Sequence, residues 1–228
     1  MEHPRGELFT LADVAALGIA GDVLWLFAYA MIIWVGFKNK TYAIPIVAVC
    51  LNFSWEAIFA VFRPPLTSAG DLDLPKLSMF IGWMVIDAII VYQCFRYGKQ
   101  QQTVAAIKRF FNTGLVICLL IAAVWMWTFT DQIHDSSGHM TAYTINLIMS
   151  MLFVDMFFRR PDLRNHSYSG AWLKFFATGV ISLANGIVMA EKGVNSYFLF
   201  LMISVFTFDL LYILLLRQAR NQTNLVPA

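Results

Sequence analysis

The stretch YFLFLMISVFTFDLLYILLL occupies residues 197–216, and Asp209 is its single charged residue. About 20 consecutive apolar residues form a helix long enough to cross the hydrocarbon core of a bilayer. The composition of the whole chain agrees with this interpretation, because 59% of its 228 residues are hydrophobic and only 13% are charged. The sequence therefore predicts an integral membrane protein.

Hydropathy predicts seven such segments, which leave little sequence for a soluble domain. We expect an all-α fold, an integral membrane bundle of seven transmembrane helices that forms a single domain over residues 1–228. The spans are expected near residues 14–36, 42–62, 77–95, 106–129, 140–158, 171–190 and 196–216.

Lysine and arginine are distributed unevenly between the two ends of these spans. Four lie before the first span or after the second, fourth and sixth: Arg5, Arg63, Lys76 and Lys192. Twelve lie on the other side: Lys38, Lys40, Arg96, Lys99, Lys108, Arg109, Arg159, Arg160, Arg164, Lys174, Arg217 and Arg220. The positive-inside rule then places the N-terminus outside or in a lumen and the C-terminus in the cytoplasm. We expect a bacterial inner membrane or the endoplasmic reticulum, and the net charge of +2 requires no nucleic-acid partner.

Two carboxylates lie inside predicted spans, Glu56 in NFSWEAIFA and Asp209 in FTFDLLYILLL. A charged side chain near the bilayer centre costs roughly 2.5–3.5 kcal/mol on insertion scales, so such residues usually have a function. Neither acid has a lysine or arginine within reach along its own helix. Because an unpaired buried acid tends to stay protonated, we expect two neutral acids that face one cavity.

Helical spacing predicts further polar and aromatic residues on inward faces. Residues three, four or seven apart share one face of a helix. On this basis the predicted faces comprise Asp22 with Trp25 and Tyr29, Asn52 with Glu56 and Phe59, Phe80 with Trp83 and Asp87, and Phe198 with Met202, Phe206, Asp209 and Tyr212. A structural role is an alternative for Asp22 and Asn146, because interhelical hydrogen bonds contribute roughly 0.6 kcal/mol each. The same alternative holds for Asn52, Trp55, Asp87 and Tyr212.

A protonated carboxylic acid in a dry aromatic pocket is a good proton donor. A polyprenyl chain partitions into the bilayer and can cyclise when its alkene or epoxide is protonated, and aromatic faces stabilise the resulting carbocation. This chemistry favours a lipophilic prenylated small molecule and the bilayer as partners. The alternatives are a seven-span transporter or ligand-binding protein that uses the acids for proton or cation coupling, and a scaffold in which they only hold helices together.

We expect no metal and no cofactor. Cyclases that ionise a pyrophosphate use an Asp-rich magnesium cluster, and no predicted span contains one. The stretch DLDLP, residues 71–75, holds only Asp71 and Asp73 and lies in a predicted loop. The expected reaction is therefore a non-redox isomerisation that begins with protonation.

The chain resembles the small seven-span membrane terpene cyclases of meroterpenoid and indole-terpenoid pathways, found in fungi and bacteria. The most specific motifs are N-x-x-W-E, formed by Asn52, Trp55 and Glu56, and F-D-x-x-Y, formed by Phe208, Asp209 and Tyr212. Also similar are the W-x-x-x-D of Trp83 and Asp87, NLIMSMLFVDMFFRR at residues 146–160 and SGAWLKFFATG at residues 169–179.

The resemblance implies catalytic roles for Glu56 and Asp209. Together with the helical spacing it gives the expected substrate-binding set, which is Asn52, Trp55, Trp83, Asp87, Asn146, Phe206, Tyr212, Asp22 and Trp25. The pairing of Glu56 with Asn52 favours Glu56 as the donor of the initiating proton, and Asp209 would then orient the substrate or accept the terminal proton. The reverse assignment remains open.

Overall fold

The computed structural model describes residues 11–67 and 69–225, and these ranges contain helices and no strands. The helices are α1 (Leu11–Asn39), α2 (Ile46–Ala57) with its π-helical continuation η1 (Ile58–Phe62), α3 (Leu74–Tyr97), η2 (Gly98–Gln101), α4 (Ala105–Gln132), α5 (His139–Arg159), η3 (Leu163–Asn165), α6 (Tyr168–Lys192) and α7 (Ser196–Leu225). The predicted all-α class is confirmed.

Six of the seven described α-helices, all except α2, are long and apolar enough to cross a membrane. The continuous segment of α2 and η1, Ile46–Phe62, is also apolar but shorter. The predicted second span begins too early, because Pro45 precedes the first turn of α2 and residues 40–45 are not helical. The chain is therefore a multi-pass membrane protein.

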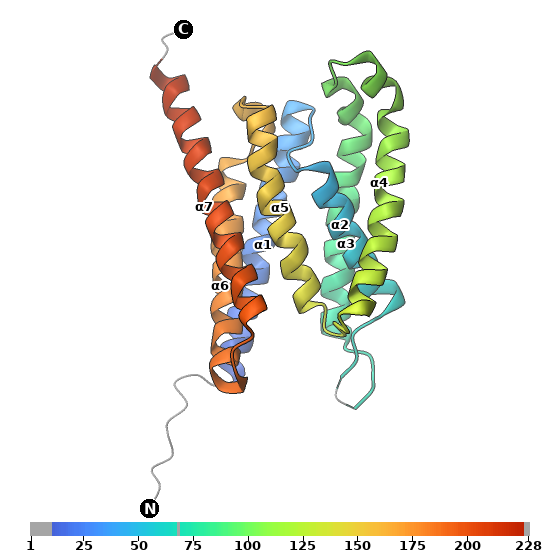
Figure 1. Cartoon of the computed structure of the whole chain (residues 1–228), viewed down its shortest axis with the longest axis vertical. Coiled ribbons are helices and arrows are strands. Elements are labelled where there is room, and N and C mark those ends of the chain that lie inside the picture. The colour runs from blue at the N-terminus through green and yellow to red at the C-terminus, as the bar shows by residue number, and fades with distance from the viewer. Residues whose placement is uncertain (1–10, 68, 226–228) are drawn as a thin grey trace, which may run out of the picture.

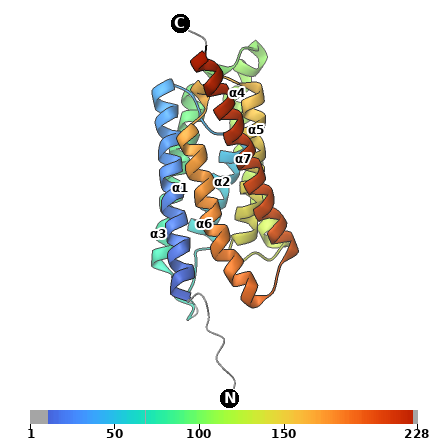
Figure 2. The same ribbon diagram turned by 90° about the vertical axis from the view of Figure 1, so that its left-hand side faces the viewer.

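The helices stand roughly side by side in an elongated bundle (Figures 1 and 2). Helix α1 packs most extensively on α6, and α5 packs on α7. Helix α2 contacts α3, α4 and α5, and seven of its twelve residues are buried. This short helix therefore joins the two sides of the bundle and presents its side chains to the interior.

A small residue permits the close contact between α1 and α6. A Cβ atom at Gly21 would lie 2.3 Å from Cγ1 of Ile181 and 3.1 Å from the carbonyl oxygen of Ala177. Small residues at such crossings let helix backbones approach closely in membranes. Gly21 therefore fixes how near the first half of α1 comes to α6.

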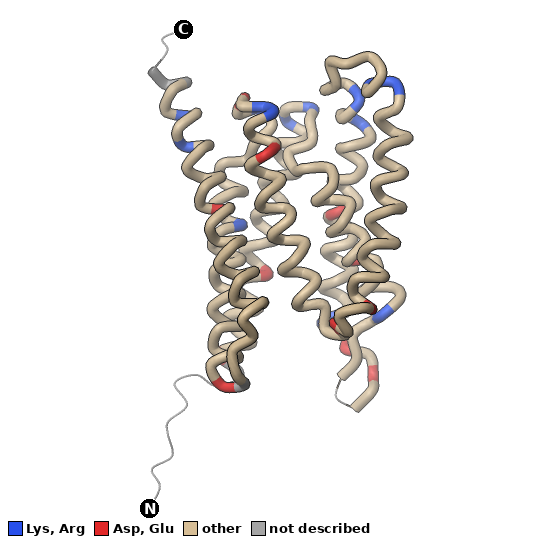
Figure 3. The backbone as a smooth tube through the Cα atoms, in the orientation of Figure 1, with Lys and Arg blue, Asp and Glu red and all other residues tan. Residues whose placement is uncertain are grey.

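Most of the lysine and arginine residues lie at the end of the bundle where α7 ends (Figure 3). At this end Arg159 and Asp155 form an ion pair of 2.8 Å. Arg5, which contributed to the predicted orientation, lies outside the described residues. Lys174 does not belong to this basic end, because its side chain is buried within the bundle (2% exposed). Without Lys174, the lysine and arginine residues assigned to the cytoplasmic side still outnumber those assigned to the other side.

His166 lies in the connection between α5 and α6 and is buried. Its Nε2 donates to the carbonyl oxygen of Arg160, and its Nδ1 accepts from the hydroxyl of Tyr212, both at 2.8 Å. Burial lowers the pKa of His166, although the hydrogen bond to Arg160 and the charge of Asp162 act in the opposite direction. The neutral ring therefore ties this connection to α7.

Because the pKa of His166 is lower in the folded state, the unfolded chain takes up this proton first as the pH falls. The contribution of the neutral His166 ring to the free energy of unfolding is therefore complete above about pH 6.5, the ordinary histidine pKa, and is lost as the pH falls below it. We expect wild type to lose up to about 1.4 kcal/mol more unfolding free energy than His166→Asn between pH 7.5 and 5.5, measured by denaturant titration in detergent. His134→Asn, at an exposed position, is the control and should follow wild type.

Candidate functional site

A cavity of about 290 Å³ lies between α1, α2, α3, α5 and α6. It lies toward the end of the bundle where the α2–α3 and α4–α5 connections run, since Lys76 and Ser137 are part of its wall. Seven of the predicted site residues line it: Asp22, Trp25, Asn52, Trp55, Glu56, Trp83 and Asn146. The inward faces predicted for α1, α2 and α3 therefore meet in one place.

Glu56 contributes a carboxyl group to the cavity wall and is 9% exposed. Its Oε2 has no hydrogen-bond partner among the described residues. No ion pair between Glu56 and a described lysine or arginine is formed. Oε2 is itself buried, so its capacity to form a hydrogen bond is unused in the described part of the chain.

Asn52 lies one helical turn before Glu56 and donates its amide to the hydroxyl of Tyr29. The ring of Tyr29 lies 5.3 Å from that of Trp83 in an edge-on arrangement and 5.7 Å from that of Trp25. These three rings, from α1 and α3, form an aromatic wall. Aromatic faces attract cations, so this wall suits a ligand that carries positive charge.

Trp55 is held on both sides. Its Nε1 donates to the hydroxyl of Thr141 at 2.8 Å, and Thr141 in turn donates its hydroxyl to Asp135 at 2.9 Å. The Trp55 ring lies 4.8 Å from that of Phe59 and 5.4 Å from that of Phe80. A hydrogen bond and two ring contacts thus fix the orientation of Trp55 in the wall.

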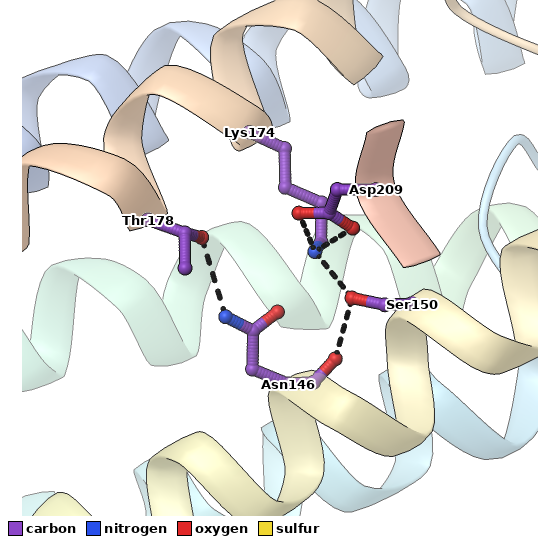
Figure 4. Close-up of polar contacts among 5 residues, drawn as sticks. All are labelled: Asn146, Ser150, Lys174, Thr178 and Asp209. Carbon is purple, nitrogen blue, oxygen red and sulfur yellow. Dashed lines mark hydrogen bonds and ion pairs between the residues drawn. The ribbon is translucent and has the colours of Figure 1, made fainter. Parts of the chain in front are cut away.

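Asp209 has a basic partner, contrary to the expectation of an unpaired neutral acid. Nζ of Lys174, on α6, donates to both carboxylate oxygens at 2.6 and 2.7 Å, and to Oγ of Ser150 at 2.7 Å (Figure 4). Asp209 is not part of the cavity wall. The expectation that both acids face one cavity is therefore wrong for Asp209.

Three further predicted substrate-binding residues also lie off the cavity. Phe206 is 47% exposed, and its ring packs on Phe175 at 4.4 Å on the outer face of the bundle. Tyr212 is buried and contacts His166. Asp87 is buried beside Tyr29, and neither of its carboxylate oxygens has a hydrogen-bond partner in the described part of the chain. A shared helix face was therefore insufficient to predict contact with the cavity.

The family model of the Pyr4-like transmembrane terpene cyclases matches residues 3–222. The chain belongs to this family. It is similar to terpene cyclase macJ of Penicillium terrestre, at 26% identity over 68% of this chain and 60% of that protein. It is also similar to the Pyr4-family terpene cyclase mfmH of Annulohypoxylon moriforme, at 28% identity over 68% of this chain and 62% of that protein. The match thus spans about three fifths of these relatives' lengths, and no solved structure matches the chain.

Several wall residues of this terpene cyclase family member were not in the expected substrate-binding set. Helical spacing predicted Tyr29 on the same face as Asp22 and Trp25, but Tyr29 was not counted among the residues of the site. Lys76 and His139 lie in the first turns of α3 and α5, where the sequence pattern does not distinguish a cavity mouth from a solvated helix end. Lys174 was attributed to the cytoplasmic end, although the apolar residues around it in SGAWLKFFATG indicate burial.

Proposed function

We propose that the chain is a membrane-bound terpene cyclase in which Glu56 protonates the alkene or epoxide of a prenylated meroterpenoid or indole-terpenoid substrate. The observation that carries this proposal is the carboxyl group of Glu56 in an aromatic cavity, with one oxygen that lacks a partner in the described chain. Membership of the transmembrane terpene cyclase family supports the reaction class.

In the proposed reaction, the O–H of Glu56 transfers its proton to the epoxide oxygen or to an alkene carbon. The epoxide C–O bond, or the alkene π bond, gives up its electrons and leaves a carbocation. Neighbouring alkenes then attack in turn and close rings, while Trp25, Tyr29 and Trp83 stabilise the moving charge by cation–π attraction. Loss of a proton from carbon to water ends the sequence, and the Glu56 carboxylate takes up a proton in return. The acid is thus restored, the product is an isomer of the substrate and no redox change occurs.

The residues that line the cavity favour one direction of binding. Lys76, at the start of α3, is part of the wall, and its Nζ lies 5.7 Å from the centre of the Phe80 ring. Tyr29, Trp25 and Trp83 form the aromatic wall. We propose that the polar head of the substrate lies near Lys76 and that its prenyl tail lies against these rings.

The orientation of the chain in the membrane is part of this proposal. Helix α1 begins and helix α7 ends at opposite ends of the bundle, as an odd number of crossings requires (Figure 1). With six long helices, the segment Ile46–Phe62 supplies the seventh crossing. The basic end in Figure 3 would be cytoplasmic by the positive-inside rule, which places the cavity in the outer half of the membrane.

Incubation of membranes that contain the chain with farnesylated aromatic substrates tests the proposal. One substrate would carry a terminal epoxide and the other the corresponding alkene. We expect a product with the same mass and new rings from at least one of them, detected by chromatography with mass spectrometry and NMR, and none from membranes without the chain. Movement of unchanged substrate across the membrane, without a new carbon skeleton, would instead support the transporter alternative.

A further inference from the structure

The ion pair of Lys174 and Asp209 is buried at the contact between α6, α5 and α7. Both residues are almost completely buried, at 2% and 3% exposed, and Ser150 is fully buried. The ammonium group uses its donors on both oxygens of Asp209 and on Oγ of Ser150. Asp209 is thus held by a partner on the neighbouring helix.

The space beside this pair is too small for a substrate. A second cavity, lined by Lys174 and Tyr212 among others, has a volume of about 10 Å³. A single water molecule needs roughly that much room, so a prenyl group does not fit there. Because Asp209 is also absent from the wall of the larger cavity, direct contact between its carboxylate and the reacting carbons has no support in this arrangement.

Lys174 is nevertheless connected to the larger cavity by two routes. Ser150, which accepts from Lys174, donates to the carbonyl oxygen of Asn146 at 2.9 Å, and the amide of Asn146 donates to Thr178 at 3.3 Å (Figure 4). Nζ of Lys174 also lies 5.4 Å from the centre of the Trp25 ring. Asn146, Thr178 and Trp25 all line the cavity.

We infer that Asp209 is the counter-ion of Lys174, and that the pair is a positioning device that holds Trp25 and Asn146 in the wall of the reaction cavity. This inference rests on the proposed cyclase function and changes the role of its second acid. Lys174 needs Asp209, because a buried charge that loses its partner is strongly unfavourable, whereas replacement of both charges by apolar groups is often tolerated. Asp209 therefore acts through Lys174 and not on the substrate.

The decisive experiment is a double-mutant cycle with Lys174→Met, Asp209→Leu and the double variant, measured in membranes as kcat and KM per folded protein. We expect each single variant to lose on the order of a hundredfold in kcat, the size of effect that misplacement of site residues produces. The double variant should recover at least about tenfold over Asp209→Leu, since no charge is left unpaired. It should remain below wild type and give altered product ratios, because Trp25 and Ser150 have lost their contact with the ammonium group.

Ser150→Ala provides a second test in case the single charge variants do not fold. It keeps the ion pair but removes the acceptor that Ser150 offers to Lys174 and the hydrogen bond to the carbonyl oxygen of Asn146. We expect a several-fold lower kcat per folded protein and a modestly lower thermal midpoint in detergent, because one donor of the buried ammonium group loses its partner. The matched control is Thr207→Ala on α7, an exposed hydroxyl that bonds only within its own helix, and it should behave as wild type.

The outcomes separate the possible roles of Asp209. A double variant as inactive as Asp209→Leu, with normal folding, would overturn the inference in favour of direct acid or base catalysis. Single variants and Ser150→Ala with wild-type kcat per folded protein would reduce the pair to a structural contact and also overturn it. Absence of a cyclised product with the wild-type chain would overturn both proposals, whereas turnover by wild type with an inactive, folded double variant would overturn this one alone.

Discussion

Glu56→Gln is expected to slow cyclisation by about 10²- to 10⁴-fold, which is the contribution of general acid–base catalysis. Glutamine has almost the same shape as glutamic acid and can donate an N–H hydrogen bond, but it cannot deliver a proton at a useful rate. The substrate should still bind, so the loss should appear in kcat with little change in KM. The measurement is the rate of isomer formation in membranes with the farnesylated epoxide and alkene substrates.

The same substitution should leave the fold intact. Oε2 of Glu56 has no partner in the described chain, so the exchange breaks no hydrogen bond of that atom. Asp155→Asn is the matched acid-to-amide control, because Asp155 lies far along α5 in a half-exposed ion pair with Arg159. It should keep wild-type kcat. If kcat of Glu56→Gln stayed within about threefold of the wild-type value, Glu56 would not be the proton donor.

The sequence could predict Glu56 in a cavity because the signals lie within single helices. Asn52, Trp55 and Glu56 share a face of α2, and Trp25 and Trp83 lie on faces of α1 and α3 that also carry acids. A membrane helix turns its polar face away from lipid, so these faces had to meet in the interior. Local spacing was sufficient there because five of the helices enclose a common space.

The partner of Asp209 could not be predicted in the same way. Lys174 is 35 residues away and on another helix, so only the packing of α6 against α7 brings the two charges together. The neutral, cavity-facing Asp209 followed from examining α7 alone. The prediction for Phe206 was wrong for a related reason, since its ring packs on Phe175 of α6 and is 47% exposed. Spacing predicts which residues share a face, and tertiary packing decides what that face meets.

A second substitution with a large expected effect is Gly138→Ala, in the turn between α4 and α5. This residue has φ 78°, and a Cβ atom on it would lie 2.7 Å from Cζ2 of Trp55 and 2.9 Å from Cζ of Phe59. Backbone strain in the left-handed region costs about 1–2 kcal/mol, and overpacking adds about 1–3 kcal/mol. We therefore expect Gly138→Ala to lower the free energy of unfolding by about 2–5 kcal/mol, measured by denaturant titration in detergent.

Gly70→Ala separates the two contributions of Gly138, because Gly70 also has a positive φ of 90° but a Cβ atom on it would meet no atom within 4 Å. Gly70→Ala should therefore lower the free energy of unfolding only by the backbone strain, about 1–2 kcal/mol. The additional decrease in Gly138→Ala measures the cost of the close contact between the new methyl group and Trp55. Because Trp55 lines the cavity, the ring must move to admit the methyl group, so Gly138→Ala should also change the product ratio, which Gly70→Ala should not. Equal losses of stability with unchanged products would show that the turn does not position Trp55.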